Sequence, residues 1–165
     1  MKAVANSSVL ISLSAIGQLD LLQERFSEIL IPQAVWQEVV VKGKGQPGAQ
    51  EIKSSGWIKV EKVKDRSLVR LLQVSLDEGE SEAIALAREV NADIVLLDEK
   101  DARLTAQRIG LRVLGTIGVL IWAKKTGHIL SLQEQLNALR DRAKFRFSKE
   151  LRHEAMKSVS EGTNQ

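Results

Sequence analysis

The sequence contains no cysteine, which excludes disulfide bridges, thiolate metal sites and cysteine nucleophiles. Its two histidines are too few for a histidine-rich metal centre, so any metal site must be built mostly from oxygen ligands. No apolar run approaches the roughly 20 residues that span a bilayer, and the N-terminus does not follow the pattern of a signal peptide. We therefore expect a cytoplasmic protein with no membrane partner.

The charge of the chain is modest overall but unevenly distributed. With 165 residues and a formal net charge of +3, the protein is compatible with a nucleic-acid partner without requiring one. Acidic residues gather at 77–82 and 98–101, and basic residues gather at 42–44, 124–125 and 140–157. An acidic cluster repels phosphate unless a divalent cation bound to the acids bridges to it. The pattern therefore favours a hard ion such as Mg²⁺ or Mn²⁺.

Short apolar runs alternate with helical patterns along most of the chain. Strands are predicted at residues 2–6, 28–31, 57–63, 92–97 and 111–114. Parallel strands joined by helical crossovers are covered on both faces, so we predict an α/β protein, a three-layer α/β/α sandwich with a five-stranded parallel sheet. No linker interrupts the pattern. We assign residues 1–150 to one domain and 151–165 to the end of the last helix and a flexible tail that begins at 161.

Several helices carry start signals. Asp77 with Glu80, and Ser131 with Glu134, have the spacing of a capping box. Thr116 is predicted to cap the helix that follows it. Negative charge near a helix N-terminus is stabilised by the helix dipole, and this structural role is one sufficient explanation of the acids at 77–80.

Polar side chains follow two of the predicted strands. Asn6 ends the apolar run at 1–5, and Asp98 ends the run at 94–97. Open α/β sheets bind ligands beyond the carboxyl ends of their strands, where the strand order reverses. Glu38, after the second strand, and Glu82, before the fourth, are predicted to reach the same edge. Taken alone, Glu38 and Glu82 also suit a solvated helix surface, and Asp98 suits a polar turn.

Four segments together resemble a known family in their order and spacing. They are VANSSVLI at 4–11, IPQAVWQEV at 31–39, LDEGESEAIA at 76–85 and LLDEKDAR at 96–103. On these segments the chain resembles the PIN domain family, metal-dependent nucleases that include the VapC-type toxins of toxin–antitoxin pairs. The stretch GTIGVL at 115–120 is similar to a PIN-like subgroup. The resemblance covers residues 1–150 and implies a five-stranded parallel sheet in a three-layer sandwich.

The resemblance also implies a role for each candidate residue. Asn6 occupies the position of the family's first aspartate, and Glu38, Glu82 and Asp98 match its second, third and last acids. All four would hold the metal ion, and the three acids would be the catalytic residues. Ser8 matches the small polar residue that supports the first acid.

The implied activity is hydrolysis of RNA phosphodiesters with one or two Mg²⁺ or Mn²⁺ ions. Asp101 and Thr116 are expected to support the site. The leading hypothesis is a metal-dependent endoribonuclease, the toxin of a type II toxin–antitoxin pair, which forms a homodimer and is silenced by an antitoxin protein. Residues 120–122 form either an exposed apolar face or part of the core. The basic stretch at 140–146 either contacts RNA or forms a solvated helix and turn.

Asn6 keeps a second hypothesis open. An amide oxygen can bind Mg²⁺ but adds no charge, so this site would hold a metal less tightly than one with an aspartate. The chain would then be a catalytically attenuated PIN module that binds nucleic acid or a protein partner. A phosphatase-like hydrolase is less favoured, because its aspartate nucleophile would stand where Asn6 lies.

Overall fold

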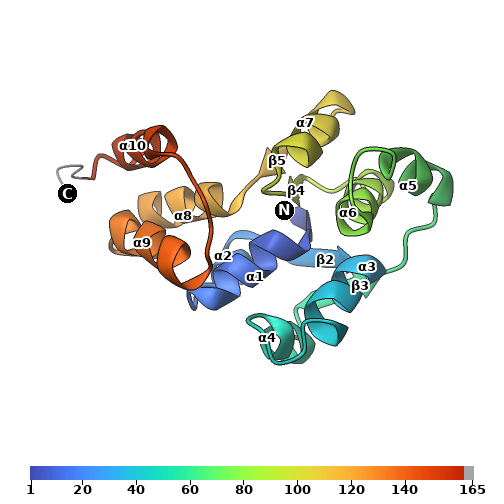
Figure 1. Ribbon diagram of the computed structural model, residues 1–165, viewed down its shortest axis with the longest axis horizontal. Helices are drawn as coiled ribbons and strands as arrows, with labels where there is room; N and C mark the ends of the chain where they lie inside the picture. Colours follow the sequence, from blue (N-terminus) through green and yellow to red (C-terminus); the bar gives the residue numbers. More distant parts are fainter. Residues whose placement is uncertain (162–165) are drawn as a thin grey trace.

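The computed structural model describes residues 1–161 as a central sheet covered by helices (Figure 1). The sheet has five parallel strands in the order β3-β2-β1-β4-β5, which confirms the predicted α/β fold class. The strands are β1 (Lys2–Ala5), β2 (Glu28–Pro32), β3 (Ile58–Glu61), β4 (Ile94–Leu96) and β5 (Val113–Leu114). The helices are α1 (Ser7–Ala15), α2 (Leu21–Arg25), α3 (Gln33–Trp36), the π-helical turn η1 (Gln37–Val41), α4 (Ala49–Ser54), α5 (Arg66–Leu72), α6 (Glu78–Glu89), α7 (Lys100–Arg108), α8 (Thr116–Lys125), α9 (Leu132–Arg142) and α10 (Lys149–Ser158).

Alternate side chains of the central strands enter two separate cores. In β1, Ala3 and Ala5 belong to one core and Val4 belongs to the other. In β4, Leu96 belongs to the same core as Ala3 and Ala5, and Val95 belongs to the same core as Val4. Because neither face of these strands meets water, both read in the sequence as continuous apolar runs.

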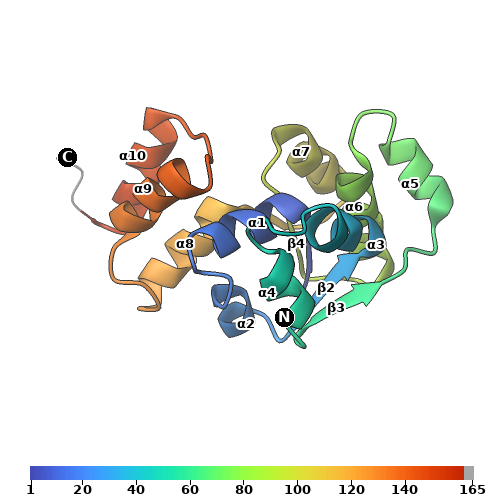
Figure 2. The same ribbon diagram turned by 60° about the horizontal axis from the view of Figure 1, so that its bottom comes forward.

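Helices cover both faces of the sheet (Figures 1 and 2). α5, α6 and α7 contribute to one core, and α1, α2 and α8 contribute to the other, with α9 and α10 packed beyond α8. Leu120 is fully buried in this second core, and Ile121 and Trp122 are half-buried, so residues 120–122 belong to the core. No helix among residues 1–161 is long and apolar enough to cross a membrane.

β3 forms one edge of the sheet and pairs with β2 alone. Ile58 is buried against the core, whereas the next three residues of the strand are exposed. The alternation of charged and apolar residues at 57–63 predicts such a half-exposed edge strand.

The capping box of α6 forms as predicted. Asp77 Oδ1 accepts a hydrogen bond from Glu80 N at 2.7 Å, and Glu80 Oε1 accepts one from Asp77 N at 3.2 Å. The predicted cap of α8 is wrong, because Gly115 precedes the helix and Thr116 is its first helical residue. The Thr116 hydroxyl donates to Asp98 Oδ2 instead.

The strand order reverses at the centre of the sheet. The chain leaves β1 toward β2 and β3 on one side, and then returns to β4 on the other side of β1. Ala5 pairs with Leu96, and Asn6 N donates to Leu96 O at 3.1 Å. This reversal places the residues that follow β1 and β4 in the crevice where α/β proteins bind ligands.

The last helix packs onto the second core. α10 begins at Lys149, and Ala155 and Met156 are buried in the core that α8 and α9 share. Glu161, where the tail is predicted to begin, instead accepts hydrogen bonds from the backbone of α9 and ends beside a lysine of α8. The rest of the predicted tail, 162–165, lies outside the described residues.

Glu161 anchors the end of α10 to the start of α9. Burial alone would raise the pKa of Glu161, but hydrogen bonds from Gln133 N and Leu132 N and the ammonium of Lys124 outweigh it and lower the pKa below the ordinary glutamate value. A carboxyl with a lowered pKa stabilises the fold above its unfolded-state pKa, and the contribution is lost as the pH falls through the lowered value.

We expect Glu161→Gln to reduce the free energy of unfolding at pH 7 by about 1–2 kcal/mol, because it removes charge-assisted hydrogen bonds. Urea denaturation measures this loss, which should shrink once the pH is low enough to protonate Glu161 in the native chain. Glu154→Gln, at an exposed position on α10, is the matched control. An equal loss in both variants would contradict the anchoring role.

Candidate metal centre

Asn6 lies at the junction between β1 and α1. Its residue surface is 6% exposed, and its side chain makes no capping bond to the helix that it precedes. Among residues 1–161, no donor lies within hydrogen-bonding distance of its buried Oδ1. A buried acceptor without a partner costs about 1–3 kcal/mol, so such an atom calls for an explanation. A ligand oxygen kept free for a metal ion is one such explanation.

Glu38 approaches from the π-helical turn η1. Lys42 N donates to Gln37 O at 2.8 Å, which closes a turn one residue wider than an α-helical turn. Ser7 Oγ donates to Glu38 Oε2 at 2.8 Å and holds this carboxylate beside the start of α1. Turns of this type occur often at functional sites. The residue is otherwise exposed, so its carboxylate is open to solvent.

The first turn of α6 borders the space beside these two side chains. A β-carbon added at Gly79 would lie 3.2 Å from Asn6 Oδ1 and 3.3 Å from Glu38 Oε2. Both oxygens therefore border the volume that a side chain at position 79 would occupy. Glycine keeps this volume open.

Asp98 is held rigidly at the end of β4. Its Oδ1 accepts from Thr116 N at 2.8 Å, and its Oδ2 accepts from Thr116 Oγ1 at 2.8 Å and from Ser8 Oγ at 2.9 Å. Ser8 thus contacts the last acid, whereas the resemblance placed it in support of the first. Asp101, the other predicted supporting residue, is exposed in the first turn of α7.

Glu80 is a further acid at this edge, one that the sequence analysis reads only as a capping residue. It is 6% exposed. Burial raises its pKa, the hydrogen bond with Asp77 lowers it in part, and the nearby carboxylates of Asp77, Glu99 and Glu38 raise it further. A buried carboxyl among like charges is an environment that a bound divalent cation relieves.

Glu82 points away from these acids. Residues two apart on a helix project about 200° apart around its axis, so Glu80 and Glu82 face different neighbours. Glu82 Oε1 accepts from Ala34 N at 3.1 Å, and Oε2 pairs with Arg66 Nη1 at 2.9 Å. In the structure Glu82 joins α6 to α3 and α5, and both of its carboxylate oxygens are engaged in these bonds.

A match to a protein-family model identifies the family to which this chain belongs. The model of the DUF3368 family, described as a PIN domain, matches residues 2–161. The chain belongs to the PIN domain family. PIN domains are generally nucleases and typically use divalent metal ions. The family match confirms the resemblance that the four sequence segments indicate.

Solved structures and curated proteins add no information about the site. The PIN domain is similar to the structure of a PilT N-terminus domain protein from the hyperthermophilic archaeon Sulfolobus solfataricus P2. The two are 17% identical, the match covers 90% of this chain and 98% of that one, and the TM-score is 0.47. No curated protein matches the chain. The site residues of this PIN domain are therefore assigned from its own geometry.

The oxygen atoms at this edge of the PIN domain suit a hard divalent ion in kind. No three His, Cys, Asp or Glu side chains among residues 1–161 lie close enough together to hold a metal unaided. The amide oxygen of Asn6 supplies a further donor and has no other partner. Asn6, Glu38, Glu80 and Asp98 all carry oxygen donors, the kind that Mg²⁺ and Mn²⁺ prefer, but of these four only Asn6 Oδ1 and Glu38 Oε2 border one common volume in this structure.

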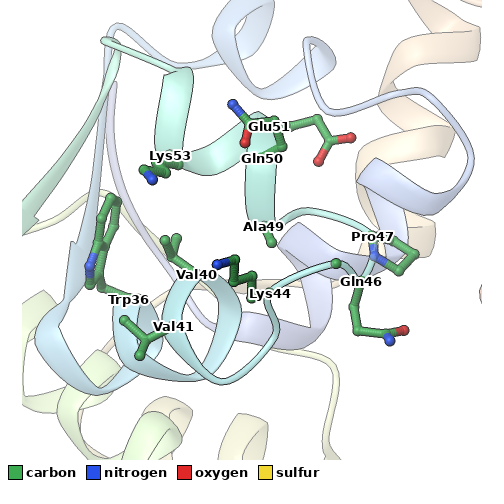
Figure 3. Close-up of a pocket in the computed structure, with 11 residues that line it drawn as sticks. Trp36, Val40, Val41, Lys44, Gln46, Pro47, Ala49, Gln50, Glu51 and Lys53 are labelled. Carbon is green, nitrogen blue, oxygen red and sulfur yellow. The ribbon is translucent and has the colours of Figure 1, made fainter.

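A separate hollow lies behind the helix that carries Glu38. It has a volume of about 890 Å³ and is enclosed by η1 on one side and α4 on the other (Figure 3). Trp36, Val40 and Val41 line one wall, and Gln50 and Lys53 line the other. None of the candidate ligands lines this hollow, so its position does not change their assignment.

Glu80 and Glu82, two of the four acids of α6, allow a direct test of this assignment. A raised pKa means that the ionised Glu80 destabilises the metal-free fold once the pH exceeds that pKa. Glu80→Gln keeps the capping-box acceptor and removes the charge, so it should raise Tm in EDTA at pH 7. The same variant should lose most of the Tm increase that Mn²⁺ gives the native chain.

Glu82→Gln is the matched control. It weakens a buried acceptor of Arg66 and Ala34 N, so it should lower the free energy of unfolding by about 1–3 kcal/mol while keeping the Mn²⁺-dependent increase in Tm. Thermal denaturation with EDTA or Mn²⁺ measures both effects. If Glu82→Gln lost the response to Mn²⁺ and Glu80→Gln kept it, the assignment would be reversed.

Proposed function

We propose that this PIN domain is a metal-dependent endoribonuclease that binds Mg²⁺ or Mn²⁺ where Asn6 and Glu38 border one volume, with Glu80 and Asp98 as the further acids of that edge. The observation that carries the proposal is the buried Oδ1 of Asn6, which has no partner among residues 1–161 and borders the same open volume as Glu38. The switch point of the sheet supports a ligand site here. Membership of a nuclease family and a net positive charge favour a nucleic acid as substrate.

The chain's own residues prepare the site before substrate binds. Ser8 and Thr116 fix Asp98 in one orientation, and Ser7 does the same for Glu38. When bound, a divalent ion would lower the pKa of a water molecule that it coordinates and would place positive charge beside the substrate phosphate. Positioning residues of this kind affect metal affinity or activity about 10–100-fold when they are removed.

Asp98→Asn should abolish cleavage, because it removes a charge from the site while keeping the size of the side chain. The measurement uses structured and unstructured RNA with Mn²⁺, and native and variant proteins purified in parallel. Asp93→Asn, at the amino end of the same strand, is the control and should cleave as the native protein does. Cleavage that persists unchanged in Asp98→Asn would come from a contaminant or another site, and the nuclease proposal would fail.

The substitution Asn6→Asp tests whether the uncharged side chain of Asn6 is a metal ligand. A third carboxylate beside Glu38 and Glu80 adds like charge, so Tm in EDTA should fall. The extra charge should tighten Mn²⁺ binding about tenfold or more in calorimetric titration, since ligand charge sets affinity for hard ions. If the native chain does not cleave RNA and this variant does, the natural protein is an attenuated module that binds nucleic acid or a partner. If Mn²⁺ affinity is unchanged, Asn6 is not a ligand.

A role as the toxin of a toxin–antitoxin pair is the further part of this proposal. It rests only on the resemblance of the sequence to VapC-type toxins, and so do the antitoxin partner and the homodimer. Residues 120–122 offer no support for a dimer face, since Leu120 is buried within the chain. The dimer and the antitoxin stay predictions.

A further inference from the structure

A second candidate binding surface lies next to Asp98, outside the candidate metal centre. A hollow of about 560 Å³ opens there between α7 and α8. Apolar residues such as Leu114 and Ile121 line it, together with the cations Lys100, Arg103 and Arg146. Among residues 1–161, Asp98 is the only acidic residue that lines it.

Arg103 lies at the end of this hollow nearest the acids. Its Nη1 donates to Leu97 O at 3.2 Å. A β-carbon at Gly115 would lie 2.6 Å from that nitrogen and 3.0 Å from Asp98 Oδ1. Glycine at 115 therefore lets the guanidinium and the carboxylate approach the same point. Among the ion pairs formed within residues 1–161, none includes Arg103.

A neighbouring hollow of about 510 Å³ shares Phe145 and Arg146 with the first as lining residues. The neighbour adds Arg140 and Lys144 and the ring of Phe147. The rings of Phe145 and Phe147 have centroids 6.3 Å apart and are tilted by 45°. We call the lining of these two neighbouring hollows, from Asp98 to Phe147, the strip; it carries the cations of both, and its rings Phe145 and Phe147 are partly buried against the core.

We propose that this strip binds a single-stranded RNA segment adjacent to the cleaved phosphate, with Arg103 and Arg146 on phosphates and Phe145 against a base. This inference rests on the proposed function and names the part of the substrate that lies outside the metal centre. Cations along a groove that also presents aromatic rings are typical of single-strand binding, because every unpaired base offers a face to stack. A duplex hides those faces, and an acidic peptide would use the cations and leave the rings without a matching group.

The test measures binding separately from cleavage. A fluorescent, uncleavable 2′-O-methyl oligonucleotide of 12 nucleotides is titrated with the full chain in EDTA, and anisotropy gives the affinity over a range of salt concentrations. The double variant Arg103→Ala, Arg146→Ala is compared with Arg108→Ala, Arg112→Ala, which removes the same charge from exposed positions outside the strip.

The double variant of the strip should reduce the slope of log K against log [salt] by about 1.4, since each lost phosphate contact accounts for about 0.7 on a single strand. The control should keep the native slope. Phe145→Leu should weaken binding about fivefold or more without changing the slope, because it removes a stacking surface and no charge. Phe147→Leu is the second variant in case Phe145→Leu does not fold.

Several results would overturn the proposal. The first is an equal loss of RNA affinity in the strip variant and the control variant. The second is binding of a 12-base-pair duplex as tight as that of the single strand. The third is Arg103-dependent binding of poly-L-glutamate without binding of RNA. Cleavage with Mn²⁺ is scored independently. Strip-dependent binding without any cleavage would leave this inference standing and defeat the nuclease proposal, whereas cleavage with native-like binding by the double variant would defeat this inference alone.

Discussion

The parallel pairing of β1 with β4 determines where every other part of the site lies. The last bond of this pairing, from Asn6 N to Leu96 O, brings the ends of two strands together that are about 90 residues apart in sequence. α1 begins directly after this bond, so its first two serines reach Glu38 on one side and Asp98 on the other. A helix start that carries two adjacent hydroxyls therefore joins the two halves of the acidic edge.

Strand ends and caps were within reach of the sequence because they depend on local chemistry. The continuous apolar runs predict β1 and β4, and the capping box of Asp77 and Glu80 predicts the start of α6. The direction in which each of these acids of α6 points is harder to predict. Glu80 and Glu82 are both buried, and they differ only in the neighbouring elements that each one faces. The capping box places Glu80 in the first turn, and this was the available sign that it, and not Glu82, faces the strand ends.

The contacts of Ser7, Ser8 and Thr116 could not be predicted in the same way. Each hydroxyl bonds a carboxylate at least 18 residues away in sequence, and the partner depends on how layers pack. Local rules assign a threonine before a helical pattern to the cap, but Gly115 takes that place, and Thr116 turns its hydroxyl to Asp98. Tertiary hydrogen bonding thus overrides a local preference where the half-buried carboxylate of Asp98 accepts from three donors.

The π-helical turn at Gln37–Val41 has a consequence for how this chain can vary in length. Such a turn accommodates one residue more than an α-helical turn, so it behaves as an insertion retained within a helix. Deleting one residue here would restore regular bonding and rotate the segment that carries Glu38 by about 100° relative to the residues after it. Ser7 would then have no carboxylate to donate to. The loop at 43–48 follows immediately and is itself held at its ends, because a β-carbon at Gly43 would meet Val39 O and Gly48 has a positive φ.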